Sequence, residues 1–326
     1  MNKISIIIPT YNRADSIKDT LVCLQGQKTN PEFNFEVIIV DNNSQDQTKK
    51  VIQSYIPLLS RKFKYCFEPK QGREFALNCG IENATGDIIA CLDDDCTVDN
   101  YYVLNIYEAF RRAGQETGFI GGKILPLWMG EKIPEWLNEF LPGNPERKNN
   151  LDGTNEFFCG PLGILDYGDQ PFALEPNPNG EYPKLFYGAN ISFRRSLFER
   201  FGYFSSENTL VEDTEICLRL LNSGVKALYD PTIRVYHKIK TDGVTPGYYN
   251  RWYFTKGRHR ETVQHHDDKF YSDTFDMFKR SLPEQRIKEK LLNRCQALFN
   301  FGQIIKEEVK EEQEKPMKIL FVLAFN

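Results

Sequence analysis

Short runs of β-branched and other apolar residues recur through the first 130 residues, and they alternate with segments whose apolar residues follow helical spacing. The apolar runs predict strands at residues 4–8, 36–40, 64–67, 87–92 and near 118–125. The segments between them predict helices at residues 14–27, 46–59, 75–84 and 101–113. Such an alternation is typical of an α/β fold, in which right-handed crossovers join parallel strands.

The pattern is irregular from about residue 126 to 186, where Pro, Gly and Asn are frequent, and we expect a long loop region there. Regular spacing returns at Gly188 and predicts a helix near 212–223. Two short apolar runs near 225–229 and 233–237 predict two further strands, separated by a break.

The last part of the chain is strongly charged. Residues 283–313 carry regularly spaced apolar residues among the charges, which predicts a helix that packs on the core or touches a membrane surface. We therefore expect a main domain at 1–240, a C-terminal helical extension at 241–306 and a charged linker with an apolar tail at 307–326.

The composition is that of an ordinary globular protein. A net charge of −4 over 326 residues gives no general positive field, so we expect no nucleic-acid partner. The eight cysteines form no C-x-x-C pair, which argues against a zinc site and for a reducing compartment. The apolar run 319–325 is too short to cross a bilayer. We expect a cytoplasmic protein, with peripheral contact to the inner face of the cell membrane as a further option.

Polar residues cluster where the predicted strands end. Residues 10–13, 41–44 and 93–95 each follow an apolar run, and the carboxyl ends of strands in α/β sheets are where ligands bind. Asp41 could accept a hydrogen bond from a base or ribose, whereas Ser44 or Asp46 would cap the next helix.

Three adjacent carboxylates, Asp93, Asp94 and Asp95, follow the fourth predicted strand directly. Neighbouring carboxylates repel each other by about 1 kcal/mol per close pair in water, and by more when partly buried. A divalent cation would relieve this repulsion, and oxygen ligands favour Mg²⁺ or Mn²⁺ over zinc. The alternative is a solvated acidic turn or a helix cap.

Three later features allow two interpretations each. Glu212 and Asp213 open a predicted helix, where acidic residues stabilise the helix dipole, but one of them could act as a general base. His237 follows a short apolar run and is either structural or a metal ligand. The basic and aromatic segment 251–260 is either a solvated helix face or a diphosphate site.

Six motifs, in this order, resemble those of glycosyltransferase family 2, the inverting group with the GT-A fold. They are PTYNR (9–13), VDNNSQDQT (40–48), GREFALNCGIENATGD (72–87), LDDD (92–95), GANISFRR (188–195) and VEDTEICLRL (211–220). The resemblance covers roughly residues 1–260. It implies a mixed, mostly parallel central sheet flanked by helices, and transfer of a sugar from a nucleotide-sugar donor, with UDP as the usual nucleotide.

The resemblance also implies roles for individual residues. The residues expected to bind the nucleotide-sugar are Pro9, Thr10, Tyr11, Arg13, Asp41, Arg73, Asp93, Asp94, Gly188, Ala189 and Asn190. Among them, Arg73 matches a basic residue that reaches the base or the phosphates. Asp213 matches the catalytic base, with Glu212 beside it. The expected ligands of a divalent cation, Mn²⁺ or Mg²⁺, are Asp95, Asp93 and His237.

The expected acceptor is a hydroxyl group of a glycan or of a lipid-linked glycan, in glycan or polysaccharide synthesis. Processive members carry the motif Q-x-x-R-W, but here Tyr248 stands where Gln would precede Arg251 and Trp252. We therefore expect single additions.

Other functions remain open. They are a sugar-1-phosphate nucleotidyltransferase, a non-catalytic module that binds a nucleotide-sugar, and a phosphatase of the haloacid dehalogenase type, which shares D-x-D-x-T.

The apolar residues 317–326 resemble the first strand of a glycosyltransferase domain with the GT-B fold. One hypothesis is that the chain is part of a longer two-domain enzyme, and that the second glycosyltransferase domain is missing from it. The alternative is a tail that docks on the main domain.

Overall fold

The computed structural model describes residues 3–59, 62–130, 132–134, 137, 159–177, 184–205, 212–259, 296–298 and 300. These residues belong to two compact units, Met1–Met129 with Leu162–Ile239, and Gly130–Pro161 with Lys240–Asn326. The expected main domain, 1–240, ends beside the last residue of the first unit. The expected tail at 307–326 lies outside the described residues, as does most of the predicted helix at 283–313.

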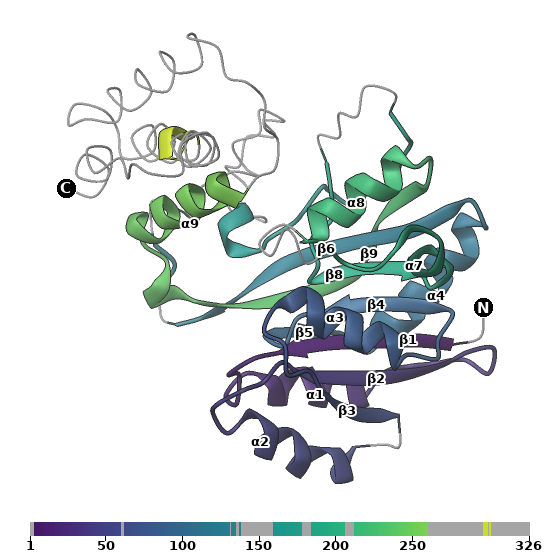
Figure 1. Cartoon of the computed structure of the whole chain (residues 1–326), viewed down its shortest axis with the longest axis horizontal. Helices are drawn as coiled ribbons and strands as arrows, with labels where there is room; N and C mark the ends of the chain where they lie inside the picture. Colours follow the sequence, from purple (N-terminus) through teal and green to yellow (C-terminus); the bar gives the residue numbers. More distant parts are fainter. Residues whose placement is uncertain are drawn as a thin grey trace. The chain divides into compact units, whose positions relative to one another are not determined.

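The first unit contains a mixed sheet, and its first four strands are parallel (Figure 1). They are β1 (Lys3–Thr10), β2 (Asn34–Asp41), β3 (Phe63–Phe67) and β4 (Ile88–Leu92), and they lie in the order β3-β2-β1-β4. Each has a strongly apolar sequence because both faces of a parallel sheet are covered. The predicted α/β fold is confirmed, and each of the four strands lies within three residues of its predicted bounds.

The later strands make antiparallel pairs with β4 and with one another. They are β5 (Cys96–Val98), β6 (Thr117–Met129), β7 (Phe172–Leu174), β8 (Asn190–Arg194) and β9 (Lys226–Lys240). The sheet continues from β4 through β8, β6 and β9 to β5, and β7 pairs with the other end of β9. The two strands predicted at 225–229 and 233–237 are therefore one strand, and the predicted break between them was wrong.

The reason lies in the pairing of β9 around Pro231. Residues 227–229 pair with β7, whereas residues 235–237 pair with β5. Pro231 has no N–H to donate, and it falls in the interval between these two partners. The strand can therefore continue through the proline without losing a bond to either of them.

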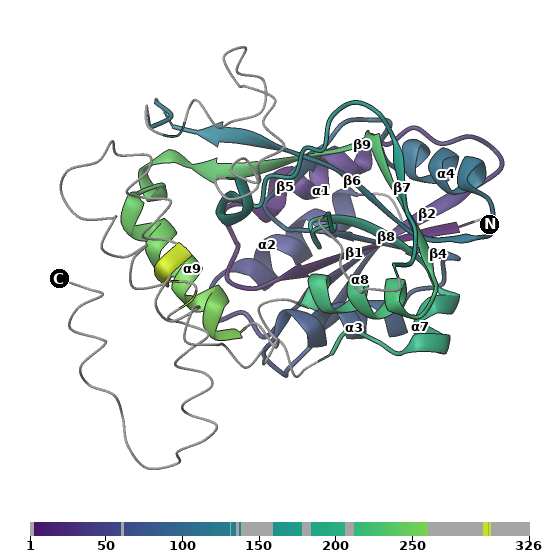
Figure 2. The same cartoon turned by 90° about the horizontal axis from the view of Figure 1, so that it is seen from above.

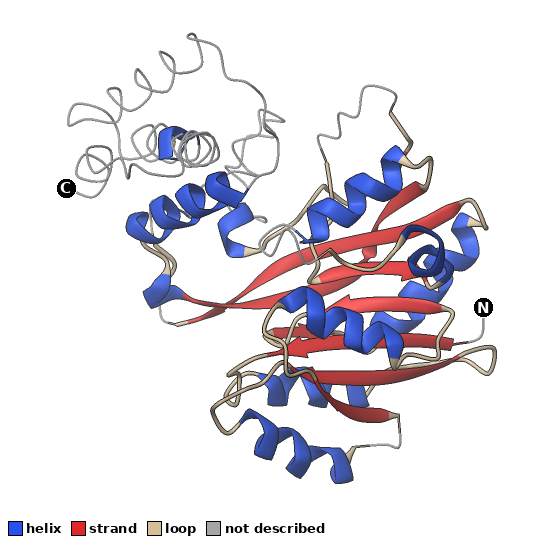
Figure 3. Ribbon diagram, in the orientation of Figure 1, coloured by secondary structure: helices blue, strands red, loops and turns tan. Residues whose placement is uncertain are grey.

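Helices cover both faces of this sheet. The helices are α1 (Ile17–Gln25), α2 (Thr48–Tyr55), α3 (Arg73–Glu82), α4 (Tyr102–Ala113), α7 (Ser196–Phe201) and α8 (Glu212–Asn222). In the view from above, α3, α7 and α8 lie along one face and α1 and α4 along the other (Figure 2). The 3₁₀ turns in this unit are η1 (Ile56–Leu58) and η2 (Gly160–Leu162), the latter starting in the second unit. Figure 3 shows how strands and helices alternate in this layered arrangement.

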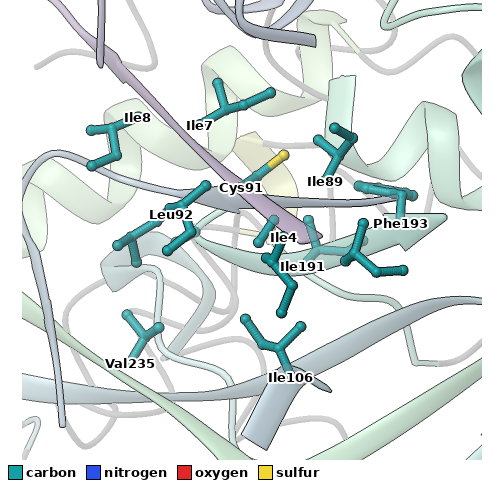
Figure 4. Packing of buried hydrophobic residues seen from close by; sticks show 14 of the residues in the cluster. Ile4, Ile7, Ile8, Ile89, Cys91, Leu92, Ile106, Ile191, Phe193 and Val235 are labelled. Atoms are coloured by element: carbon teal, nitrogen blue, oxygen red, sulfur yellow. The ribbon is translucent and has the colours of Figure 1, made fainter. Parts of the chain in front are cut away.

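The core lies between the sheet and these helices. Its centre is formed by side chains that are almost fully buried, contributed by β1, β4, β8, β9 and α4 (Figure 4). They include Ile4, Ile7, Ile8, Ile89, Cys91, Leu92, Ile106, Ile191, Phe193 and Val235. Helix α3 packs closely on β1 because Gly80 faces Ile7, and a Cβ at Gly80 would overlap that isoleucine.

The second unit contains the 3₁₀ turn η3 (Thr241–Gly243) and the helix α9 (Pro246–His259). The basic and aromatic segment 251–260 is thus helical up to His259, although its side chains beyond Phe254 lie outside the described ones. Tyr248 donates a hydrogen bond to the carbonyl of Pro161, 2.5 Å away, in the same unit. No helix in the described parts of the chain is long and apolar enough to cross a bilayer.

Candidate active site

A cavity of about 390 Å³ lies at the carboxyl ends of the parallel strands. Its lining consists of Pro9, Thr10, Tyr11, Arg13, Asn42, Gln71, Gly72, Arg73, Ala76, Asp93, Asp94 and Asp95. Eight of these twelve residues are among those expected from the sequence to bind the nucleotide-sugar or the cation. The size of the cavity suits a small-molecule ligand.

Four lining residues were not singled out from the sequence: Asn42, Gln71, Gly72 and Ala76. All four lie inside or beside the motifs 40–48 and 72–87, which is the signal that could have found them. Gly72 has a φ of 141°, in the region that favours glycine, so its place at the start of α3 has a backbone cause.

Hydrogen bonds from main-chain N–H groups to side-chain oxygens join the loops after β1 and β2. Asn12 and Asn43 both adopt left-handed backbone conformations, with φ of 53° and 62°. The N–H of Asn12 donates to Ser44 Oγ at 3.0 Å, and the N–H of Gln45 donates to Asn12 Oδ1 at 2.8 Å. Ser44 therefore joins the two loops rather than capping α2, whereas Asp46 accepts from the N–H of Thr48 at the start of that helix.

Asn42 ties the loop before α3 to the same wall of the cavity. Its amide donates to the carbonyl of Lys70 at 2.6 Å, and its Oδ1 accepts from the N–H of Gly72 at 2.9 Å. The Asn42 N–H itself donates to the carbonyl of Thr10 at 2.8 Å. The main chain and the buried side chain of Asn42 thus join the ends of β1 and β2 to the loop before α3.

Asp41 is the last residue of β2 and is 1% exposed. Its two oxygens accept from Tyr65 Oη at 2.9 Å and from the N–H of Ser44 at 3.0 Å. Asp41 does not line the cavity, so its contact with a base or ribose stays a prediction.

The three carboxylates that follow β4 have different partners. Asp93 accepts from Arg73 Nη2 at 2.6 Å, whereas Asp94 lies 3.5 Å from Arg13 Nε and Asp95 lies 3.4 Å from Arg13 Nη2. Burial, with the nearby charges of Asp95 and Asp93, raises the pKa of Asp94 to about 7. The predicted repulsion is therefore relieved by two arginines, and the raised pKa of Asp94 favours its partial protonation near pH 7.

His237 lies on β9 beside Asp95, because Cys96 of β5 pairs with His237 in the sheet. The His237 Nε2 is 3.4 Å from Asp95 Oδ1, and Nδ1 is 2.8 Å from the carbonyl of Leu162. Since a carbonyl can only accept, Nδ1 carries the proton and Nε2 faces the carboxylate. Burial alone would lower the pKa of His237, but the hydrogen bond and charge of Asp95 outweigh it and raise the pKa.

Asp93, Asp95 and His237 do not converge on one point. Within the described ranges, no three His, Cys, Asp or Glu side chains form a group that could hold a metal ion. Asp93 points to Arg73 instead, which leaves Asp95 and His237 as a pair. Asp93 as a metal ligand therefore stays a prediction.

Asp213 and Glu212 begin α8. Asp213 Oδ2 accepts from the N–H of Gly188 at 2.9 Å, and its Oδ1 accepts from the N–H of Thr214 at 2.7 Å. Glu212 is 6% exposed and pairs with Arg73 Nη1. Burial and the charge of Asp213 raise the pKa of Glu212, although Arg73 opposes this shift.

The segment 188–190 leads into β8 and is buried. Gly188 contacts the base candidate Asp213 through its main chain, as described above. The amide of Asn190 donates to the carbonyls of Lys123 and Ile233, each at 3.0 Å, so this side chain holds β6 and β9 together. Contact of Gly188, Ala189 or Asn190 with a sugar stays a prediction.

Comparisons with known proteins agree with the motifs. The model of the family described as glycosyl transferase family 2 matches residues 5–166, a range that contains the cavity lining. The chain belongs to glycosyltransferase family 2. The resemblance stated from the sequence is thereby confirmed.

The chain is similar to a glucosyl-dolichyl phosphate glucuronosyltransferase of Haloferax volcanii, 23% identical over 73% of this chain and 69% of the relative. A chondroitin synthase of Escherichia coli is 27% identical over 68% of this chain, but over 32% of its own length. Glycosyltransferase AglE of Haloferax volcanii is 38% identical over 29% of this chain and 31% of its own length. The chain thus spans about a third of two of these relatives.

A solved structure shows the fold. The mannosyltransferase PcManGT of Pyrobaculum calidifontis, in complex with GDP-Man and Mn²⁺, superposes on 98% of this chain and 78% of its own, with a TM-score of 0.51 and 18% identity. The predicted GT-A fold is confirmed by this likeness.

Proposed function

We propose that this family 2 glycosyltransferase transfers a sugar from a nucleotide-sugar, a UDP-sugar on the family resemblance, to a hydroxyl acceptor with inversion. The observation that supports it most is a cavity lined by Arg13, Asp93 and Asp95. Asp93 pairs with Arg73, another lining residue. The carboxylate of Asp213 lies near this arginine and accepts a hydrogen bond from Gly188. A diphosphate needs positive charge and a hydroxyl nucleophile needs a base, and these side chains offer both.

The pair formed by Asp95 and His237 fits a divalent cation. The bond from Nδ1–H to the carbonyl of Leu162 fixes the ring tautomer and leaves Nε2 facing the carboxylate, which is how protein metal sites orient histidine. An imidazole ligand favours a transition ion such as Mn²⁺ over Mg²⁺. When bound, such an ion supplies Lewis-acid stabilisation to a departing diphosphate.

The protein's own groups account for the proton and the leaving group. Asp213 would take the proton of the acceptor hydroxyl as its oxygen bonds to the anomeric carbon. The bond from that carbon to the diphosphate breaks, and its electron pair leaves with the nucleoside diphosphate. A carboxylate has about four lone-pair sites, so Asp213 can still accept a proton beside its two main-chain donors.

The names of the relatives suggest the substrates. The Haloferax volcanii glucuronosyltransferase acts on glucosyl-dolichyl phosphate by its name, and the Escherichia coli relative is a chondroitin synthase. We therefore favour a glycan or lipid-linked acceptor. Because the mannosyltransferase structure holds GDP-Man, GDP is the nucleotide to test beside UDP.

The test is a calorimetric titration of the protein with UDP and with GDP. Each titration is carried out once in the presence of Mn²⁺ and once in the presence of a chelator. We expect at least about tenfold tighter binding of one nucleotide with Mn²⁺, since one such charge contact contributes about 1–4 kcal/mol. Asp95→Asn should remove that difference, whereas Asp99→Asn, outside the cavity lining, should keep it. Equal affinity with and without Mn²⁺ would refute the metal-dependent part, and formation of pyrophosphate from a nucleoside triphosphate would indicate a nucleotidyltransferase instead.

A further inference from the structure

We propose that Arg73 is a positioning residue, which ties the carboxylate loop after β4 to the first turn of α8 and so holds Asp213 in place relative to the donor. The proposal rests on the proposed function, because Asp213 acts as a base only there. It differs from the role that the family resemblance implies for Arg73, which is direct contact with the base or the phosphates of the nucleotide.

The geometry of the guanidinium carries the proposal. Arg73 Nη2 donates to Asp93 Oδ1 at 2.6 Å, while Nη1 donates to Glu212 Oε1. These partners are 20 and 139 residues away in the sequence. A guanidinium group is planar and holds its donors in a rigid fork, so it fixes the spacing between the two carboxylates that it joins.

Charge balance points the same way. Arg73 lies among three carboxylates, those of Asp93, Glu212 and Asp213, so its positive charge is already offset within the protein. Glu212 is 6% exposed and next to Asp213 in the sequence. Without Arg73, a buried carboxylate beside the base would have no compensating charge, and removing one partner of such a pair is strongly destabilising.

Gly188 links Arg73 to the base by a second route. The N–H of Gly188 donates to Asp213 Oδ2 at 2.9 Å. A Cβ at this position would lie 2.7 Å from both Nη1 and Nη2 of Arg73. The lack of a side chain at Gly188 therefore leaves room for the guanidinium beside the main-chain group that orients Asp213.

The two roles of Arg73 predict different kinetics. A residue that binds the nucleotide loses affinity and turnover together when it is removed, whereas a positioning residue loses mainly turnover. If Arg73 and Glu212 act as a pair, their substitutions should not be additive. Removing the charge of Glu212 should then offset part of the effect of removing Arg73.

The experiment is a double-mutant cycle of wild type, Arg73→Met, Glu212→Gln and the double variant. In each we would measure the melting temperature, the affinity for UDP and GDP with Mn²⁺, and the rate of donor turnover. We expect Arg73→Met to keep nucleotide affinity within about threefold and to lose about 100-fold in turnover. The double variant should regain about tenfold of that turnover and melt above Arg73→Met.

Matched substitutions separate this effect from general destabilisation. Arg112 also pairs with a buried carboxylate, Asp230 at 2.8 Å, but does not line the cavity, so Arg112→Met should lower the melting temperature and leave turnover unchanged. Gly188→Ala should reproduce the loss seen in Arg73→Met. Gly243→Ala, with nothing within 4 Å of the added Cβ, should not.

Two results would overturn the proposal. One is a loss of nucleotide affinity in Arg73→Met as large as its loss of turnover, and the other is simple additivity of the Arg73 and Glu212 effects on melting temperature. A wild-type protein that binds neither nucleotide would refute the proposed function. The melting temperatures would then still decide whether Arg73 and Glu212 are tied.

Discussion

Two main-chain donors orient the carboxylate of Asp213. The N–H groups of Gly188 and Thr214 each hold one of its oxygens, at 2.9 and 2.7 Å. Backbone donors cannot rotate away, so the carboxylate has a fixed direction before a substrate arrives. Asparagine has the same shape but one acceptor oxygen instead of two. It should therefore keep the fold, lose one of these two hydrogen bonds and lose the ability to take a proton.

Asp213→Asn should therefore melt close to wild type and bind nucleotide normally, but lose roughly 10²–10⁴-fold in transfer rate, which is the usual contribution of a general base. The assay is donor-to-acceptor transfer beside a thermal melt. Glu215→Gln is the matched control, since Glu215 lies in the same first turn but pairs with Arg219 at 2.7 Å. Near-normal transfer by Asp213→Asn would remove it from the role of base.

Glu36 is a buried carboxylate with a structural task at the other end of the sheet. It is 2% exposed, and it accepts from Ser5 Oγ and the Thr85 N–H at 2.7 Å and from Lys64 Nζ at 2.6 Å. Burial alone would raise the pKa of Glu36, but these donors outweigh it and hold the pKa well below its usual range.

Glu36→Gln should lower the free energy of unfolding at pH 7 by about 1.5–3 kcal/mol, the value of a hydrogen bond to a charged group. Because the folded pKa is depressed, this stabilisation exists above the unfolded pKa and disappears as pH falls toward the folded one. Urea unfolding of both proteins should thus differ at pH 7, and the difference should begin to shrink below about pH 4 and continue to shrink as the pH falls further. A difference that is the same at every pH would contradict this assignment.

Residue identities at the site could be predicted from the sequence better than residue pairings. Eight expected residues line the cavity, because their motifs follow strand ends that the fold brings together. The pairing of Arg73 with Glu212 could not be predicted, because it depends on how α3 and α8 lie on one face of the sheet. The hydrogen bonds by which Asn190 joins β6 to β9 could not be predicted for the same reason.

Among the elements, the close packing of α3 on β1 depends on Gly80. This glycine occupies an interior helical position, where it costs about 1 kcal/mol relative to alanine in a helix without tertiary contacts. A larger residue does not fit at this position, because any Cβ there would overlap Ile7. Helix α3 begins at Arg73, so the distance between α3 and the sheet also sets where the guanidinium lies.

Gly80→Ala should destabilise the protein by about 1–3 kcal/mol, as overpacked cores do. Combined with Ile7→Ala, which makes room for the added methyl group, it should cost less than the two single changes together. Chemical denaturation of the four proteins measures this coupling. Strict additivity would show that α3 shifts freely on β1 and does not fix the site.

The elements that escaped sequence analysis are short or interrupted. Strand β5 has three residues and α7 has six, so neither is long enough to repeat its period of apolar positions twice. Strand β9 was divided at Pro231, since a proline usually ends a strand and the change of partner from β7 to β5 is not visible in a sequence. The long buried strands gave no such difficulty.

For the whole molecule, the described residues place the candidate site entirely within the first unit. All cavity residues, with Asp213, Glu212 and His237, belong to residues 1–129 or 162–239. The expected main domain, 1–240, stays a prediction. The segment 130–161, which has no periodic pattern in the sequence, belongs to the second unit.

Hydrogen exchange should show which parts of this unit respond to a ligand. We would add Mn²⁺ and whichever of UDP and GDP binds. Exchange of the amide hydrogens should become slower in residues 11–16, 42–47 and 93–95, which lie at or beside the cavity, and should not change in α4. Mass spectrometry of peptides from both states gives the comparison. Protection spread evenly over the sheet would indicate general stabilisation and not a local site.

The hydrogen bonds that join Asn12 to Ser44 and Gln45, and Asn42 to Gly72, have a consequence for how a donor is captured. Asn12 and Asn43 already adopt the left-handed conformation that these loops need. The wall of the cavity therefore forms during folding and not when the donor binds. Little of the binding free energy of a donor is then used to order the protein. Capture should accordingly be fast and nearly rigid, with most of the difference between rival nucleotides expressed in how slowly each one departs.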